Sequence, residues 1–245
     1  FSAIWVTMQQ QKAENPFRIE QLADLRPQRQ QIRPILVIGI PSGLENGMFQ
    51  IGKLCVSSLT ATLGTSAIAA NAVANTVATV ANIPGNTIGL AVIPVIGRCL
   101  GAGEKKQAVQ YAKLLLGIAA AGLAVMNIAV FFSIPAVAQA YHLTQAAKQM
   151  CIEVIRLFCI FSVFFWALSF TLPQVLRSGG DAKYTMSISI LSMWIFRVGF
   201  SVVLAQYLGM GVFGVWVAMQ LDWIARTAAF VPGLRGKRWY LPAEA

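Results

Sequence analysis

Residues 33–103 read RPILVIGIPSGLENGMFQIGKLCVSSLTATLGTSAIAANAVANTVATVANIPGNTIGLAVIPVIGRCLGAG, and this stretch decides the fold. It contains two long apolar runs, Ile35–Leu63 and Ala67–Leu100, which are separated by the short turn Gly64–Ser66. Each run exceeds the roughly 20 residues that an α-helix needs to cross a ~30 Å hydrocarbon core. The stretch therefore predicts two membrane-spanning helices. The second is long enough that we expect it to tilt, to kink at Pro84 or to project into water.

The rest of the chain has the same character. Of its 245 residues, 57% are hydrophobic and only 11% are charged, whereas about a quarter of the residues in a soluble domain are charged. The fold class predicted is therefore all-α, a polytopic transmembrane helix bundle. Four further apolar runs bring the expected spans to six: about Leu114–Ile134, about Val154–Leu176, Tyr184–Leu208 and Val212–Val231.

We expect three parts along the chain. Residues 1–33 would combine the end of a preceding transmembrane helix with a cytoplasmic linker, because Phe1–Met8 is apolar and Gln9–Arg33 is polar. The polar segment is also compatible with an amphipathic helix at the membrane surface. Residues 34–231 would form the six-helix transmembrane lobe, and residues 232–245 a cytoplasmic tail.

The formal net charge of +10 comes mostly from the connections between apolar runs. Connections on the cytoplasmic side of a membrane are enriched in Lys and Arg, so the charge reports topology rather than nucleic-acid binding. Every second connection is basic, which predicts six crossings of the plasma membrane with both ends in the cytoplasm. The basic segments are Gln9–Arg33, Arg98–Lys113, Arg177–Lys183 and Arg235–Arg238, whereas Gly64–Ser66, Pro135–Gln149 and Gly209–Gly211 hold only Lys148.

Nothing in the sequence indicates an enzyme. There is one histidine, His142, and the four cysteines have neither CxxC spacing nor a neighbouring histidine, so we expect no metal site. No nucleophile with a neighbouring base is recognisable either. We expect no cofactor.

Four asparagines mark one side of the second predicted helix. Their spacing of i, i+4, i+11 and i+15 confines them to an arc of roughly 60° at 100° per residue. Asparagine at lipid depth can bond one helix to another, or it can line a hydrated cavity. Both interpretations fit the small residues around the stripe, and we take Asn71, Asn75 and Asn82 as candidate cavity-lining residues. The four are Asn71, Asn75, Asn82 and Asn86.

Two charged residues, Glu45 and Lys53, lie within the first predicted helix. Ionisable groups in transmembrane segments are costly and usually face the bundle interior or a water-filled cavity. The two are about 12 Å apart along the helix axis, so each should find a partner elsewhere. They could form structural ion pairs. Alternatively, Glu45 binds a proton, a coupling cation or a cationic group of the substrate, and Lys53 tunes it; they are the candidate ion- and substrate-coupling residues.

A second set of charges lies in the last two predicted helices. Asp222 and Arg226 are spaced i, i+4, and Arg197 lies toward the middle of the preceding helix. Asp222 would reach Arg197 if the two helices pack together. We interpret the three as a structural charge cluster.

Several segments resemble the multidrug and toxic compound extrusion (MATE) transporters, and together they cover nearly the whole chain. The pattern begins at Gly39–Gly43 and continues through Ala69–Asn71, Pro84 and Leu100–Gly103 to the turn Leu176–Asp181. Trp194–Arg197, Asp222–Trp223 with Arg226, and Lys237–Trp239 complete it.

The resemblance implies a twelve-helix transporter with two six-helix lobes, of which this chain is the C-terminal one. Its partners would be the lipid bilayer, an N-terminal six-helix lobe that this chain lacks, and small-molecule organic cations. It implies secondary active efflux of organic cations or amphipathic drugs by antiport with H⁺ or Na⁺. Many family members carry a carboxylate where this chain has Phe49, a further candidate lining residue, so the coupling ion does not carry over.

Two alternatives to a multidrug exporter stay open. A lipid-linked oligosaccharide flippase of the same superfamily should show a cationic cavity rather than a lone acid. A partner lobe without transport activity of its own is the other alternative.

Overall fold

The structure is a computed structural model that describes residues 29–236. The predicted end of a preceding helix, most of the linker and residues 237–245 of the tail lie outside this range. The chain divides into two units, Phe1–Ile40 and Pro41–Ala245. In the first unit, residues 29–40 are helical and begin the helix α2. All contacts discussed below lie within the second unit.

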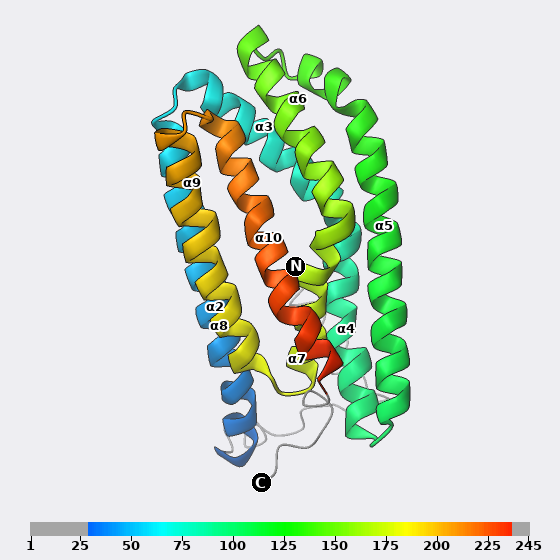
Figure 1. Cartoon of the computed structure of the whole chain (residues 1–245). Coiled ribbons are helices and arrows are strands. Elements are labelled where there is room, and N and C mark those ends of the chain that lie inside the picture. The colour runs from blue at the N-terminus through cyan, green and yellow to red at the C-terminus, as the bar shows by residue number, and fades with distance from the viewer. Residues whose placement is uncertain (1–28, 237–245) are drawn as a thin grey trace, which may run out of the picture. The chain divides into compact units, whose positions relative to one another are not determined.

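The described residues form six helical rods in chain order (Figure 1). They correspond to the six predicted spans, and the described regular structure is entirely helical. The third rod is longer at both ends than its apolar run, since its helix begins at Lys105 and ends at Ala140. The rods are α2 (Arg29–Ala61); α3 (Thr65–Ala81) with α4 (Ile83–Gly101); α5 (Lys105–Ala140); α6 (Gln145–Phe161), a π-helical stretch (Ser162–Thr171) and α7 (Leu172–Ser178); α8 (Ala182–Ser192), a π-helical stretch (Met193–Gly199), α9 (Phe200–Val202) and a π-helical stretch (Val203–Tyr207); and α10 (Gly211–Arg235).

The turn predicted between the first two spans is present, and of the alternatives for the second span the structure shows an interruption near Pro84. Gly64 precedes α3 with φ 102°, a left-handed conformation that glycine adopts without steric cost. The second rod is interrupted at Asn82, and Pro84 lies in the first turn of α4. Proline is tolerated there because its missing N–H would have no helical partner, whereas inside a continuous helix it would break the ladder.

The fourth rod departs from the regular α-helix ahead of Pro173. Its π-helical stretch ends at Thr171, and Pro173 lies in the first turn of α7. Within the stretch, the Ser169 hydroxyl donates a hydrogen bond of 2.7 Å to the Trp223 carbonyl of α10. The wider turns of a π-helix change which side chains face a neighbour, and here they join the rod to α10.

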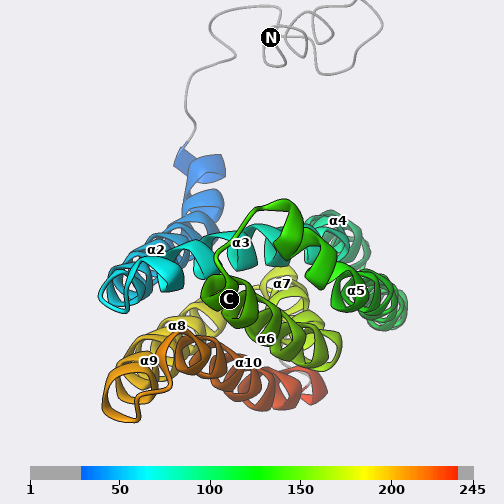
Figure 2. The same cartoon turned by 90° about the horizontal axis from the view of Figure 1, so that it is seen from above.

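The rod containing α6 and α7 lies at the centre of the lobe. It packs against α3, α5 and α10, as Figure 2 shows from above, and against α4. Alanines of α3 such as Ala70 and Ala74 are fully buried, and small side chains of this kind let helix backbones approach closely in membranes. Larger side chains pack toward α10, where the Phe158 ring lies edge-on against Trp216 and Trp223.

The outside of the lobe is apolar. Leu90 and Phe132 are each 77% exposed, and many other large hydrophobic side chains are exposed as well. A soluble monomer rarely exposes so much apolar surface. Four helices in the described part of the chain are long and apolar enough to cross a membrane, namely Ile83–Gly101, Lys105–Ala140, Gln145–Ser178 and Ala182–Tyr207. The predicted class of transmembrane helix bundle is confirmed.

Candidate functional site

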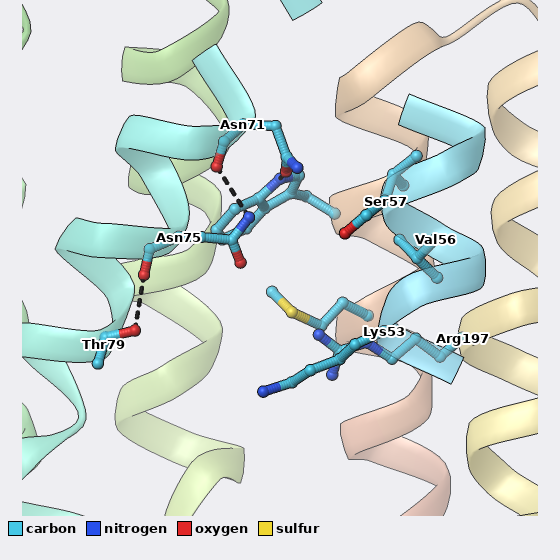
Figure 3. A pocket seen from close by; sticks show the side chains of 10 residues that line it. Lys53, Val56, Ser57, Asn71, Asn75, Thr79 and Arg197 are labelled. Atoms are coloured by element: carbon cyan, nitrogen blue, oxygen red, sulfur yellow. Dashed lines mark hydrogen bonds between the residues drawn. The ribbon is translucent and has the colours of Figure 1, made fainter. Parts of the chain in front are cut away.

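Helix α2 borders a polar cavity inside the lobe. The cavity has a volume of about 230 Å³ and lies between α2, α3 and α10 (Figure 3). A second cavity of about 300 Å³ shares six lining residues with the first, so the two adjoin. The shared residues are Lys53, Asn75, Thr79, Arg197, Trp216 and Met219.

The asparagine stripe of the second rod faces this space. Asn71 lines the first cavity, Asn75 lines both, and Asn82 and Asn86 line the second. The Asn71 Oδ1 atom also accepts a hydrogen bond of 3.0 Å from the Trp216 indole, so this residue joins α3 to α10 while it borders the cavity. Within residues 29–236, the buried Asn82 Oδ1 has no hydrogen-bond partner. The stripe therefore supplies both a contact between helices and a polar wall.

Two cationic side chains line the same space from the opposite side. Figure 3 shows Lys53 of α2 and Arg197 extending toward α3. The Lys53 Nζ atom lies 5.1 Å from the centroid of the Phe49 ring, and the Arg197 Cζ atom lies 5.5 Å from it. Neither cation forms an ion pair with any described residue. A lone cation at the centre of a membrane helix costs about 3 kcal/mol, so two of them in one cavity require compensation.

Glu45 lies elsewhere, in an ion pair with Arg177 of α7. The two side chains are only 13% and 12% exposed, and the Arg177 Nε atom also donates to the Thr185 hydroxyl of α8 at 3.1 Å. Glu45 thus has its partner on another helix, but Lys53 is not near enough to share it. The sequence did not identify Arg177, because a basic residue at the end of a span is usually a topology signal.

Within the predicted charge cluster of the last two rods, only Asp222 and Arg226 are bonded to each other. Asp222 Oδ1 and Arg226 Nε are 2.9 Å apart, and Ser192 donates to the same carboxylate. Arg226 also donates to the Ser189 carbonyl, so this buried pair holds α10 against α8. Arg197 forms no bond with Asp222 and lines the cavity instead. It lies within a π-helical stretch, where side chains leave the register that α-helical spacing predicts.

Phe49, a further predicted lining residue, borders the second cavity. Its ring lies edge-on to Phe170, with 6.2 Å between centroids. Sequence reasoning missed the aromatic residues that α10 contributes to the cavity, of which Trp216 lines both cavities. The i, i+3, i+7 spacing of Trp216, Met219 and Trp223 is the signal that would have placed these three on one face of α10.

Neither cavity has a carboxylate among the residues that line it, and its polar groups are amides, hydroxyls and two cations. Such a lining offers hydrogen bonds and positive charge to a guest, and aromatic faces to the apolar part of that guest. It has no arrangement of nucleophile and base.

Two curated relatives have a longer chain than this one. The sequence is 26% identical over 226 residues to a probable multidrug resistance protein NorM from Thermotoga maritima, covering 86% of this chain and 46% of that one. It is 24% identical to the uncharacterized transporter YisQ from Bacillus subtilis, with the same coverage of both chains. The chain thus spans about half the length of the curated relatives it matches.

Solved structures share the fold. An outward-facing multidrug resistance MATE family transporter of the MOP superfamily matches with a TM-score of 0.78 at 19% identity, over 95% of this chain and 52% of that one. A MOP superfamily transporter from Pyrococcus furiosus, described as having a binding pocket of reverse polarity, matches with a TM-score of 0.75 at 21% identity, over 94% and 51%.

The family model named MatE matches residues 41–203. The match begins at Pro41 in α2, four residues before Glu45, and ends in the rod that carries Arg197. This match covers more than half of the sequence, and it includes the asparagine stripe and both cavity cations. The chain belongs to the MatE family.

Proposed function

We propose that this chain forms one six-helix lobe of a secondary active exporter, and that the cavity between α2, α3 and α10 is its part of the substrate path. The observation that supports this most directly is the gathering of Lys53, Arg197 and the asparagine stripe around one cavity in an otherwise apolar bundle. Polar and ionisable groups are costly at lipid depth and usually mark a pathway for substrate or ions.

The proposal includes a partner and a location. Because the chain spans about half of its relatives, the other half of the path would come from an N-terminal six-helix lobe. The transporter would lie in the plasma membrane with both ends of this chain in the cytoplasm, as the basic connections indicate. Export would be driven by antiport with H⁺ or Na⁺, through alternating access of the cavity to each side.

The substrate class that the family resemblance implies is organic cations or amphipathic drugs. The aromatic lining of Phe49, Trp166 and Trp216 supports an amphipathic guest. A carboxylate is the strongest partner for a cationic drug, and in the described part of this lobe Glu45 and Asp222 are each already paired with an arginine. Carboxylates for a cationic drug would therefore come from the first lobe.

A second candidate function is favoured by the charge of the cavity. A lipid-linked oligosaccharide flippase moves an anionic, phosphate-bearing substrate, and the lining cations of this lobe match that charge. The Pyrococcus furiosus transporter, which has the same fold, is described as having a binding pocket of reverse polarity. That description is in keeping with a fold that accepts either sign of charge.

Dye efflux from vesicles tests the proposal, with the chain assembled with its first lobe and an imposed H⁺ or Na⁺ gradient. Asn75→Leu should reduce efflux at least about fivefold, because it places an apolar side chain in both cavities. The control is Thr76→Leu, one residue along α3, which is exposed and lines neither cavity. Equal efflux in both variants contradicts the proposed path, and absence of gradient-driven transport in the wild type indicates a non-transporting lobe.

A further inference from the structure

The positive charge around Phe49 exceeds the negative charge. Three cationic groups lie within 5.5 Å of the centroid of its ring, those of Lys53, Arg197 and Arg226. One carboxylate, Asp222, is bonded to Arg226 and to Ser192, so one negative charge stands against three positive ones. Lys53 and Arg197 are left as two like charges that line one cavity with no acid among its lining residues.

We infer that Lys53 and Arg197 together bind the anionic headgroup of an amphipathic molecule, a phosphate or a carboxylate, in this cavity. The inference rests on the proposed function, since it names the charge of the substrate for the same path. Two like charges in one cavity raise the free energy of the empty site, and a single anion between them lowers it.

The donors suit an oxyanion. The lysine ammonium offers three N–H groups, and the arginine guanidinium presents a planar fork that matches carboxylate and phosphate oxygens. Asn71 adds an amide whose oxygen is already occupied by the Trp216 indole, so its NH₂ group is the part available to a guest. Charge-assisted hydrogen bonds of this kind are about twice as strong as neutral ones.

The cavity also suits the apolar part of such a molecule. The second cavity continues from the two cations past Phe49 to Trp166 and Phe170. These two rings stack with 5.1 Å between their centroids and form an apolar wall. A headgroup at Lys53 and Arg197 would therefore leave its chain or ring against aromatic surface rather than in water.

Binding of small probes to the purified chain tests the inference without any need for transport. The chain is held in neutral maltoside micelles and titrated by calorimetry with hexyl phosphate, inorganic phosphate and hexyltrimethylammonium. Hexyl phosphate should bind more tightly than the ammonium probe. Lys53→Gln and Arg197→Gln should each weaken the binding of hexyl phosphate about tenfold or more, because each variant loses one charge-assisted contact. Lys113→Gln and Arg156→Gln, which are exposed and outside both cavities, should not.

Two further variants guard against misfolding. Lys53→Arg and Arg197→Lys keep the charge and should retain hexyl phosphate binding within about threefold, whereas a fold defect would affect them as well. If hexyl phosphate binds and inorganic phosphate does not, the natural ligand is an amphiphile. If inorganic phosphate binds equally well, the ligand is a free anion. Both results support the anion site, provided that the glutamine variants lose the binding.

Each contrary result has its own meaning. Tighter binding of hexyltrimethylammonium, or hexyl phosphate binding that is unchanged in both glutamine variants, overturns the anion site while the substrate path stands. No binding of any probe overturns the anion site and also counts against the path.

Discussion

The carboxylate of Glu45 on α2 is ion-paired with the guanidinium of Arg177 on α7, and this contact ties the first rod of the lobe to the fourth. Few other contacts hold α2 here. The Phe49 ring lies on Phe170, and Gly52 approaches Met193 so closely that a Cβ atom would meet its side chain. If α2 moves in the proposed transport cycle, the ion pair with Arg177 must either break or move with it.

Glu45→Gln should slow gradient-driven dye efflux and lower stability by about 2 kcal/mol, because it leaves Arg177 largely buried without a counter-charge. Chemical denaturation followed by tryptophan fluorescence measures the stability. The exchanged pair Glu45→Arg with Arg177→Glu separates two explanations. Recovery of efflux in the exchanged variant indicates that the ion pair matters, whereas continued loss indicates that Glu45 itself carries the ion. Wild-type behaviour of Glu45→Gln in both assays would remove the residue from the mechanism.

A second prediction concerns the packing of α4 on the fourth rod. A Cβ atom on Gly85 would clash with the rigid indole ring of Trp166, so Gly85→Ala should destabilise the lobe by about 1–3 kcal/mol. Gly89→Ala is the matched control, one turn along the same helix, where a Cβ atom meets nothing within 4 Å. There the substitution should be neutral or stabilising by up to about 1 kcal/mol, since alanine is the better helix former. Similar denaturation midpoints for the two variants would contradict the packing described.

A third prediction concerns the buried pair on α10. Asp222→Asn leaves Arg226, only 2% exposed, as an uncompensated charge, and should cost about 3–5 kcal/mol. The double variant Asp222→Asn with Arg226→Met removes both charges and should recover most of that loss. Denaturation of the three proteins measures the difference. A double variant as unstable as Asp222→Asn alone would show that the hydrogen bonds to Ser192 and Ser189, rather than the charge balance, hold α10 in place.

Much of the fold follows from local sequence signals. Apolar run length predicts the six rods, Gly64 the first turn, and Pro84 the break in the second rod. The 100° helical period also places the asparagines on one side of that rod, and the structure shows all four at the cavity. These are properties of single helices, which is why one sequence is enough to predict them.

The partners across helices could not be predicted in the same way. The cost of a charge at lipid depth says that Glu45 needs a partner but not which helix supplies it, and Arg177 lies far along the chain. Arg197 illustrates a second obstacle to prediction. It lies in a π-helical stretch, and no residue pattern in the sequence predicts one there. The sequence grouped it with Asp222 and Arg226, and the structure shows in addition that it lines the cavity with Lys53, around the Phe49 ring that Arg226 also faces.

The last prediction concerns water in the cavity, on which the proposed path depends. In a background with the four native cysteines replaced by alanine, Asn75→Cys should react with a membrane-impermeant maleimide at least about tenfold faster than two reference positions. Asn127→Cys is the buried reference, since Asn127 of α5 is only 1% exposed and donates a hydrogen bond to Ser162 of the fourth rod. Val125→Cys is the apolar reference, because Val125 is 69% exposed on the outside of the lobe. Lipid there would exclude the reagent and keep the thiol protonated, whereas the maleimide reacts with the thiolate. The rates are read in nanodiscs by gel shift over time. A cysteine at position 75 that reacts as slowly as both references would mean that the asparagine stripe borders no aqueous space, and the lining cations would then lack the solvent that makes their position tolerable.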